Sequence, residues 1–196
     1  IELSQTGNRN PDLVIWPETA FAGLLNRDDK LLTDTVNAAI DQDSFLLTGI
    51  PRFNTAKKLL NSALLFDHQG IIRGVYDKRH LVPFGEYVPF RTWLSFLDII
   101  VGPADFESGK ENRLISVPDI GQVQILICYE VIFAGRVAES KNRPDLIVNI
   151  TNDAWFGKTL GPSQHLYQAQ MRAVEEGVPL LRAANTGISA AFDGFG

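Results

Sequence analysis

Cysteine is nearly absent from this sequence, which has a single one, at position 128, in 196 residues. One thiol cannot form an internal disulfide, so the cysteine count does not decide between a reducing and an oxidising compartment. The sequence also has no run of about 20 apolar residues, the length needed to span a bilayer. It has no basic, cleavable leader at its start. As printed, the sequence therefore predicts a soluble chain.

Basic clusters and metal motifs are missing as well. Lys and Arg total 18 against 23 Asp and Glu, for a net charge of -5, and no basic run exceeds two residues. This balance argues against nucleic acid as a partner. The three histidines and Cys128 lack paired-ligand spacing such as HxxxH or CxxC, and no glycine motif for phosphate occurs. We therefore expect no metal and no cofactor.

What the sequence does contain is typical of one globular α/β domain. Its 45% hydrophobic content over 196 residues allows a sizeable core. Short β-branched or aliphatic runs alternate with helical stretches, which indicates layers of sheet and helix. The predicted strands are residues 13–15, 45–49, 63–66, 71–76, 114–117, 123–127, 146–150, 180–183 and 189–192.

A turn and two helices complete this outline. Residues 67–70 (DHQG) predict an antiparallel hairpin inside an otherwise parallel pattern, so the sheets should be mixed. One helix is predicted by apolar residues at helical spacing, namely Leu32, Val36, Ala39 and Ile40. A second is predicted over 164–176, with Ser163 as N-cap. Its packed face should hold Leu166, Ala169, Gln170 and Ala173.

Cys128 is the first candidate for chemistry. The apolar strand at 123–127 delivers it to the carboxyl end of a sheet, where open α/β folds bind ligands. A helix predicted over 131–139 would favour the thiolate and lower the pKa of the thiol. The alternative is that a lone cysteine after an aliphatic strand is simply a buried small hydrophobe.

Glu18 and Lys78 are the other two candidates. Each follows an apolar strand, and a thiol nucleophile needs a base such as a carboxylate. Taken singly, both are typical of solvent-facing residues. Together with Cys128, they place a carboxylate, an ammonium and a thiol at three strand ends, and converging strand ends make a site.

The order and content of these motifs resemble the nitrilase (carbon-nitrogen hydrolase) superfamily. The resemblance rests on WPE at 16–18, KRHLVPFGE at 78–86 and CYE at 128–130. The longer strings at 80–89, 151–157, 171–173 and 179–189 are similar to the bacterial apolipoprotein N-acyltransferases rather than to the soluble amidases of that superfamily. The resemblance runs from about Pro11 to the end of the chain.

The resemblance implies a role for each matched residue. Glu18 would be the general base, Lys78 would stabilise the tetrahedral intermediate with the backbone N–H of Tyr129, and Cys128 would be acylated. Glu86 would orient Lys78 or Glu18, although a solvent-facing loop acid is the alternative. Glu130 would support the triad from behind, and Tyr129 would line the pocket.

The resemblance also implies an architecture and a place in the cell. The fold would be a four-layer αββα sandwich with mixed sheets. Residues 1–196 would form one catalytic domain truncated at both ends, without the transmembrane helices of the parent protein. That parent would lie in the bacterial inner membrane, with the catalytic domain facing the periplasm.

The implied reaction is a ping-pong acyl transfer. Cys128 would take a fatty acyl chain from a phospholipid, hold it as a thioester, and pass it to the N-terminal amine of a diacylglyceryl-cysteine apolipoprotein. The partners would be the phospholipid donor, the apolipoprotein acceptor and the membrane.

Two apolar segments suit such lipid substrates. Residues 89–102 place Trp93, Leu94 and Leu97 on one face of a segment too short to span a bilayer, which would lie in an interface or cover the site. The alternative is a core helix. Residues 152–161, with Trp155 and Phe156, would form a second lipid-facing arm.

Two other functions remain open. A soluble carbon-nitrogen hydrolase would use the same triad, with water as second nucleophile on an amide or nitrile, in a small polar pocket. A catalytically silent lipid-binding module would keep the fold but leave Cys128 buried and unreactive.

Overall fold

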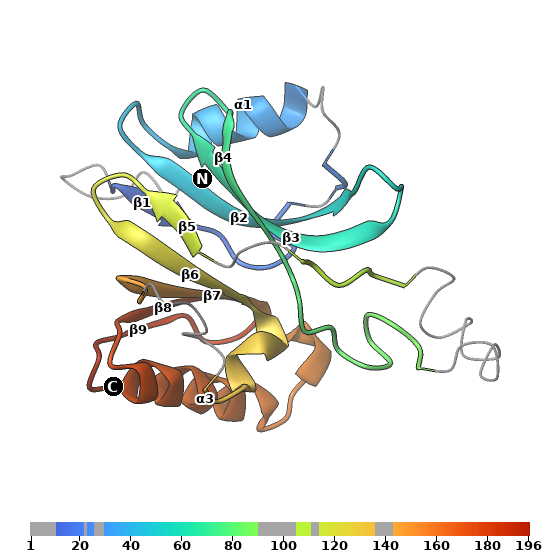
Figure 1. Cartoon of the computed structure of the whole chain (residues 1–196), viewed down its shortest axis with the longest axis vertical. Coiled ribbons are helices and arrows are strands. Elements are labelled where there is room, and N and C mark those ends of the chain that lie inside the picture. The colour runs from blue at the N-terminus through green and yellow to red at the C-terminus, as the bar shows by residue number, and fades with distance from the viewer. Residues whose placement is uncertain (1–10, 22, 26–29, 90–104, 111–113, 136–142) are drawn as a thin grey trace.

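The computed structural model describes residues 11–21, 23–25, 30–89, 105–110, 114–135 and 143–196, and its strands form two sheets (Figure 1). The first sheet has the order β1-β2-β3-β4, in which β1 is parallel to β2 and the other pairs are antiparallel. Its strands are β1 (Leu13–Ile15), β2 (Phe45–Phe53), β3 (Leu59–Asp67) and β4 (Ile72–Asp77).

The second sheet has the order β5-β6-β7-β8-β9. Its centre, β6-β7-β8, is parallel, and an antiparallel strand pairs with it on each side. Its strands are β5 (Leu114–Val117), β6 (Gly121–Ile127), β7 (Leu146–Asn152), β8 (Leu180–Asn185) and β9 (Ala190–Phe192). Both sheets are mixed, as predicted.

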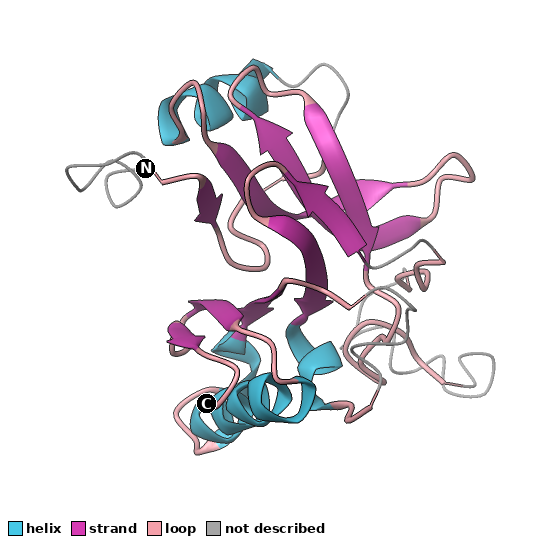
Figure 2. Ribbon diagram, turned by 60° about the vertical axis from the view of Figure 1, so that its left-hand side comes forward, coloured by secondary structure: helices cyan, strands magenta, loops and turns pink. Residues whose placement is uncertain are grey.

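The sheets pack face to face with a helix on each outer side (Figures 1 and 2). Helix α1 (Lys30–Ala39) buries Leu32, Val36 and Ala39 against the first sheet. Helix α3 (Gly161–Glu176) buries Ala169 and Ala173 against the second. The four layers αββα are those that the resemblance implied.

The period-two alternation of the strands creates this layering. In β3, Ala63 and Leu65 point into the core between the sheets, whereas Leu64 and Phe66 face α1. In β6, Ile125 and Ile127 point into the same core and Leu126 packs toward α3. A strand covered on both faces reads as a continuous apolar run.

Most predicted elements are confirmed. All nine strands lie where the sequence predicted them, and the structure lengthens several by a few residues. The hairpin between β3 and β4 is also confirmed, and it turns through Gly70, whose φ of 73° is in the left-handed region that suits glycine.

The predicted start of α3 is wrong, and its predicted buried face is confirmed only at Ala169 and Ala173. The helix begins at Gly161, ahead of Ser163, and its N-cap residue is Leu160, which makes no side-chain capping bond. Its buried face includes His165 and Arg172 beside Ala169 and Ala173, whereas Leu166 and Gln170 are only partly covered. The helix packs two polar side chains inward, which an apolar periodicity cannot reveal.

The predicted α-helix after Cys128 is also wrong within the described residues. A five-residue 3₁₀ helix, η3 (Cys128–Ile132), starts at the cysteine itself. The rest of the predicted segment, from 136 on, lies outside the described residues.

Candidate active site

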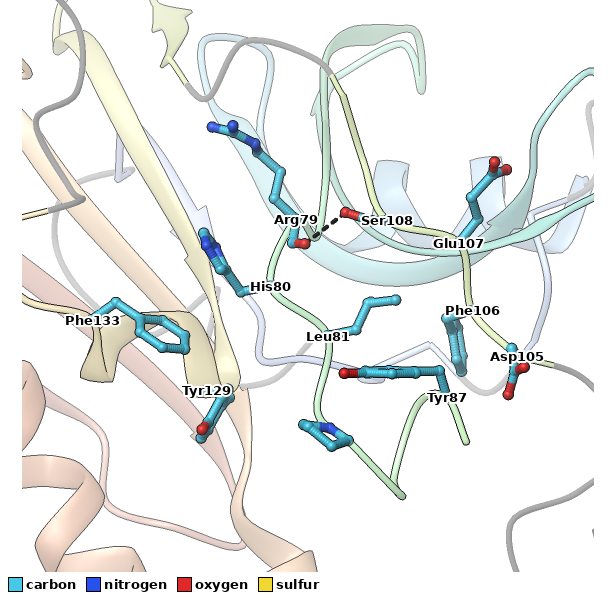
Figure 3. A pocket seen from close by; sticks show the side chains of 11 residues that line it. Arg79, His80, Leu81, Tyr87, Asp105, Phe106, Glu107, Ser108, Tyr129 and Phe133 are labelled. Carbon is cyan, nitrogen blue, oxygen red and sulfur yellow. Dashed lines mark hydrogen bonds between the residues drawn. The ribbon is translucent and has the colours of Figure 1, made fainter. Parts of the chain in front are cut away.

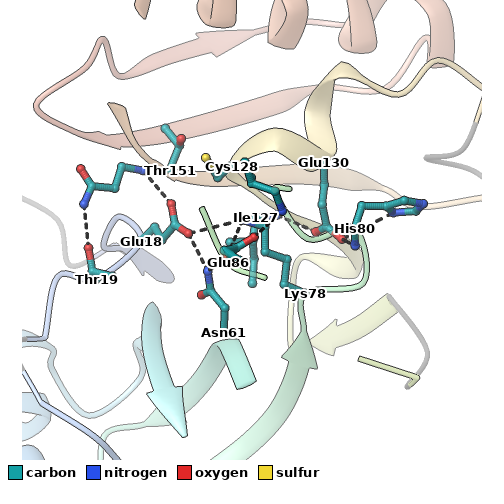
Figure 4. A network of polar contacts seen from close by, with 12 residues as sticks. Glu18, Thr19, Asn61, Lys78, His80, Glu86, Ile127, Cys128, Glu130 and Thr151 are labelled. Carbon is teal, nitrogen blue, oxygen red and sulfur yellow. Dashed lines mark hydrogen bonds and ion pairs between the residues drawn. The ribbon is translucent and has the colours of Figure 1, made fainter. Parts of the chain in front are cut away.

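Three strand ends meet at one cavity of about 650 Å³ between the sheets. Glu18 follows β1, Lys78 follows β4 and Cys128 follows β6, and all three line the cavity. Segments up to 110 positions apart in sequence, from 18 to 128, thus converge as expected (Figure 4).

Glu18 is buried on a turn that lies close against β2. A Cβ atom on Gly49 would come within 2.7 Å of the Glu18 Cα, so only glycine permits this approach. The carboxylate accepts two hydrogen bonds, from Asn61 Nδ2 at 2.7 Å to Oε1 and from the Asn152 backbone N–H at 2.8 Å to Oε2. These bonds fix its orientation toward the cavity.

Lys78 is 1% exposed and lies between two carboxylates. Its Nζ is 2.9 Å from Glu86 Oε1 and 3.7 Å from Glu18 Oε1. Burial alone would lower the pKa of Lys78, but the negative charges of Glu18, Cys128 and Glu86 outweigh it and raise the pKa. The side chain is therefore held as an ammonium in the cavity wall.

Asn61 and Glu86 complete this group. Asn61, on β3, donates from Nδ2 to both Glu18 and Glu86, the latter at 2.8 Å. Glu86 also accepts the Val82 backbone N–H at 2.8 Å. We call Glu18, Asn61, Lys78 and Glu86 the cavity cluster, and its two carboxylates and one ammonium leave one net negative charge.

Cys128 occupies a constrained position in this wall. Its φ of 51° lies in the left-handed region, which a non-glycine residue seldom adopts and which clusters at functional sites. Burial raises the pKa of the thiol to about 11, and the Glu18 carboxylate adds to the rise. Lys78, the Thr151 side chain and the Tyr129 N–H oppose it.

The expectation that a helix N-terminus lowers this pKa is therefore wrong. The 3₁₀ helix that starts at Cys128 has five residues, too few for a substantial dipole. Burial and the nearby carboxylate outweigh it, so the resting group is a thiol that needs a base.

Glu130 lies behind the site rather than in it. Its carboxylate accepts bonds from Tyr76 Oη at 2.7 Å, from the N–H groups of Arg79 and His80 at 2.9 and 3.1 Å, and from the Ile127 N–H at 2.9 Å. Burial would raise its pKa, but these bonds and the His80 side chain lower it. Glu130 thus ties the Lys78 strand to the cysteine turn.

A second charged group contacts the backbone of Cys128, and one of its members, His165, also lines the cavity. Asp153 bonds to His165 Nδ1 at 2.8 Å and to Arg182 Nη2 at 2.7 Å, and all three side chains are buried. His165 Nε2 lies 3.2 Å from the carbonyl oxygen of Cys128. We call Asp153, His165 and Arg182 the anchor cluster.

The outer wall of the cavity is largely apolar. Trp155 and Phe156 line it from η4 (Asp153–Phe156) and are 81% and 39% exposed. Val82, Phe106 and Ile132 line other parts of it. Trp93, Leu94 and Leu97, predicted to form a lipid-facing arm, lie outside the described residues.

A second, more open pocket of about 630 Å³ adjoins this cavity (Figure 3). Tyr129 and Phe106 line both pockets and so form their shared wall. Tyr129 is held by an edge contact with Phe133, whose ring centroid is 5.2 Å away.

The described residues include no group of three or more His, Cys, Asp or Glu side chains arranged to hold a metal ion. Their helices are all too short or too polar to cross a membrane.

Sequence reasoning missed several residues of the site. Asn61 lies in a run of core residues, and Thr151 and Asn152 end a buried strand. The anchor cluster was missed as well, because its members were weighed only as parts of strings or, for His165, as a metal ligand. A polar residue inside an apolar strand was the available signal.

Comparison with known proteins agrees with this geometry. Residues 3–196 match the family model described as carbon-nitrogen hydrolase. The chain is 42% identical over 198 residues to the apolipoprotein N-acyltransferase of Rhizobium rhizogenes and 42% over 200 residues to that of Bradyrhizobium diazoefficiens. Each alignment covers 97% of this chain but 37% of the relative, so the chain spans little more than a third of their length.

Solved structures share the fold at low identity. Saccharomyces cerevisiae Nit3, a member of the nitrilase superfamily, superposes with a TM-score of 0.64 at 15% identity, over 95% of this chain and 70% of its own. An amidase from Nesterenkonia sp. AN1 superposes with a TM-score of 0.63 at 21% identity, over 94% of this chain and 70% of its own.

Proposed function

The chain belongs to the carbon-nitrogen hydrolase family, and from that premise we propose that it carries the catalytic centre of an apolipoprotein N-acyltransferase. The observation that carries the proposal is the convergence of Glu18, Lys78 and Cys128 on one cavity with an apolar outer wall. The names of relatives about 40% identical over nearly the whole chain support acyl transfer rather than hydrolysis.

In the first half-reaction, Glu18 accepts the proton of the Cys128 thiol as the sulfur attacks the ester carbonyl of a phospholipid. A thiol with a pKa of about 11 is a poor nucleophile near neutral pH unless a base takes its proton during attack. The carboxylate of Glu18, fixed by two hydrogen bonds, suits that role.

The tetrahedral intermediate carries its negative charge on the former carbonyl oxygen. The ammonium of Lys78 and the Tyr129 N–H stabilise this charge, and one such donor is typically worth about 10²- to 10³-fold in rate. The C–O bond then breaks, and the lysophospholipid oxygen leaves with the proton from Glu18. Cys128 remains as a thioester.

In the second half-reaction, the N-terminal amine of the diacylglyceryl-cysteine lipoprotein attacks the thioester. Glu18 takes a proton from the amine nitrogen, and the C–S bond breaks to give the amide. The departing thiolate lies near the Lys78 ammonium and recovers its proton from Glu18. The cavity cluster therefore returns to its starting state.

Glu86 and Asn61 position these groups. Glu86 binds Lys78 Nζ at 2.9 Å, and Asn61 joins both carboxylates, so the lysine cannot turn away from the cavity. Glu130 fixes the cysteine turn from behind. Tyr129 lines the cavity beside the nucleophile.

The donor and acceptor are lipids, so the cavity needs a mouth that meets a membrane. The exposed Trp155 and Phe156 would form one lipid-facing arm at that mouth, and the arm expected at Trp93, Leu94 and Leu97 lies outside the described residues. Replacing Trp155 and Phe156 with Ser should weaken binding to phosphatidylglycerol vesicles and leave the unfolding midpoint unchanged. Leu31→Ser, a substitution at another exposed apolar side chain on α1, serves as the control.

The protein carrying this chain would lie in the bacterial inner membrane with the cavity facing the periplasm. A membrane-impermeant maleimide added to intact spheroplasts should label a cysteine introduced at the exposed Thr159 in a Cys128→Ala background. Labelling that requires lysis would instead place the domain in the cytoplasm.

Intact-mass spectrometry tests the reaction itself. After incubation with phospholipid, the protein at its natural length should gain one fatty-acyl mass that hydroxylamine removes, whereas Cys128→Ala should gain none and keep the wild-type fold. Failure to acquire an adduct, together with hydrolysis of simple amides, would favour the soluble hydrolase. An unreactive Cys128 would favour the silent lipid-binding module.

A further inference from the structure

His165 contacts the backbone of the nucleophile, not its sulfur. A carbonyl oxygen can only accept, so His165 Nε2 carries the proton of the 3.2 Å bond to the Cys128 carbonyl. On the far side of the ring, Nδ1 lies 2.8 Å from Asp153 Oδ1 and 3.2 Å from Arg182 Nη2. With the proton on Nε2, a neutral ring accepts at Nδ1 from Arg182 Nη2, and a ring that also carries a proton on Nδ1 donates it to Asp153 Oδ1.

Asp153 is itself fixed from several directions. Arg182 Nη2 binds Oδ2 at 2.7 Å, and Thr151 Oγ1 donates to Oδ1 at 3.1 Å. A Cβ atom on Gly187 would lie 2.3 Å from Oδ2, so the backbone of that loop also closes over the carboxylate. Buried contacts thus run from Arg182 through Asp153 to His165, and His165 contacts Cys128.

The Cys128 carbonyl and the Tyr129 N–H lie in the plane of one trans peptide and point in opposite directions. Because His165 holds the carbonyl, it also sets the direction of the Tyr129 N–H. That N–H donates a hydrogen bond to the Cys128 sulfur. A hydrogen bond to a peptide carbonyl also polarises the peptide and strengthens its N–H as a donor.

We propose that His165 is a positioning residue for acylation, which orients and polarises the peptide whose Tyr129 N–H binds the tetrahedral oxyanion. The proposal rests on the proposed function only in that Cys128 is acylated. It gives the anchor cluster a part in the reaction, although neither Asp153 nor Arg182 lines the cavity.

Two amide variants separate this role from a structural one. The amide nitrogen of Gln reaches the place of His Nε2, so His165→Gln keeps the donor to Cys128. The amide nitrogen of Asn takes the place of Nδ1, so His165→Asn keeps the contact with Asp153 and loses the donor to Cys128. The two variants are thus matched controls for each other.

Two reactions of the protein at its natural length report on the oxyanion and on the thiol. Acylation by p-nitrophenyl butyrate forms a tetrahedral oxyanion, whereas alkylation by iodoacetamide does not, and Cys128→Ala gives the background of both. His165→Asn should slow acylation by ~10- to 100-fold and alkylation by less than ~3-fold. His165→Gln should recover most of the acylation rate.

The inference is overturned if acylation and alkylation slow in parallel, if neither slows, or if His165→Gln is as slow as His165→Asn. If His165→Asn does not fold, His165→Leu provides the variant without a donor. The ester is not a phospholipid, so this pattern can appear even if phospholipid gives no adduct. In that case the proposed donor fails and the role of His165 stands.

Discussion

Two charged clusters flank Cys128 and are built from similar groups, yet they do different work. All four side chains of the cavity cluster line the cavity, whereas the anchor cluster reaches it only through His165, which also bonds to the carbonyl of Cys128. The cavity cluster carries an excess carboxylate, Glu18, within reach of the nucleophile. In the anchor cluster the only carboxylate, Asp153, is neutralised by Arg182.

The difference shows that the role of a buried carboxylate depends on whether a cation neutralises it and on whether it lies beside the thiol. An unbalanced carboxylate beside a thiol raises the pKa of that thiol and provides a base for its proton. A balanced, fully bonded pair has no proton to exchange and serves to fix geometry. Substitutions in the two clusters should therefore produce different kinds of defect.

Glu18→Gln should produce the largest loss of activity. It removes the base and should lower turnover by ~10²- to 10⁴-fold. It also removes a charge that raises the pKa of Cys128, so alkylation of the thiol by iodoacetamide at neutral pH should become faster. Stopped-flow alkylation and turnover assays measure the two changes, with the exposed Asp41→Asn as control. If turnover is unchanged, Glu18 is not acting as a base.

Lys78→Met should come next. Loss of the oxyanion partner should lower turnover by ~10²- to 10³-fold. The variant also leaves Glu18 and Glu86 close together without their cation, which should cost about 3 to 5 kcal/mol of stability. Denaturant unfolding and turnover assays check both effects. A wild-type free energy of unfolding would show that water or protonation replaces the ammonium without strain.

Arg182→Met should mainly reduce stability. It leaves the buried Asp153 without its cation, which should cost about 3 to 5 kcal/mol. At a temperature where the variant is folded, turnover should fall by only ~10-fold, because His165 keeps its contact with Asp153. A loss of activity as large as that of Lys78→Met would remove the distinction between the clusters.

The pH dependence of stability should separate the two clusters, because the anchor cluster loses its contribution at acid pH and the cavity cluster loses its contribution at alkaline pH. Burial would raise the pKa of Asp153, but His165 and Arg182 lower it below 3.8, so its contribution is present above that pH and lost as pH falls through the lower folded value. The pKa of Lys78 is raised above 10.5, so its contribution is present below that pH and lost as pH rises through the folded value.

Thermal unfolding measured across the pH range gives both the acid limb and the alkaline limb of the stability curve. Asp153→Asn should flatten the loss of stability below about pH 4 and leave the alkaline limb unchanged. Lys78→Met should flatten the limb above about pH 10.5. Residual acid sensitivity should remain in Asp153→Asn, because the pKa values of Asp67 and Glu130 are also lowered.

Thr151→Val should have the smallest effect, since Thr151 joins the anchor cluster to Cys128 through one hydroxyl. Its single proton is donated to Asp153 Oδ1 and can turn to the Cys128 sulfur when that is a thiolate. Its loss should cost about 1 kcal/mol of stability. It should also raise the pKa of Cys128 slightly, seen as a shift of the alkylation profile to higher pH. An unchanged profile would mean that Thr151 does not stabilise the thiolate.

The strand ends that carry Glu18, Lys78 and Cys128 could be predicted because each follows an apolar run that local pattern identifies as a strand. Asn61 could not be predicted, because it lies inside such a run and bonds to Glu18 and Glu86, 43 and 25 positions away. Its partners depend on the register of β3 against β2 and β4.

The direction of the thiol pKa also needed the structure. The sequence favoured a helix N-terminus and a lowered pKa, but the chain forms a short 3₁₀ helix there, and Glu18 lies nearby. His165 was equally hidden, because a polar residue at the start of a helix is usually exposed. Its burial follows from the partners that Asp153 and Arg182 provide.

The amino-acid sequence by itself therefore determined the alternation of strands and helices, the layered α/β class and the three strand ends. These features depend on the spacing of apolar residues and on turn residues, which can be read within a few neighbouring positions. The tertiary structure decided which polar side chains are paired, which carboxylate faces the thiol and which group holds its carbonyl. Those pairings join segments that are far apart in the sequence and meet only when the strands pair and the helices pack on them, so no local pattern records them.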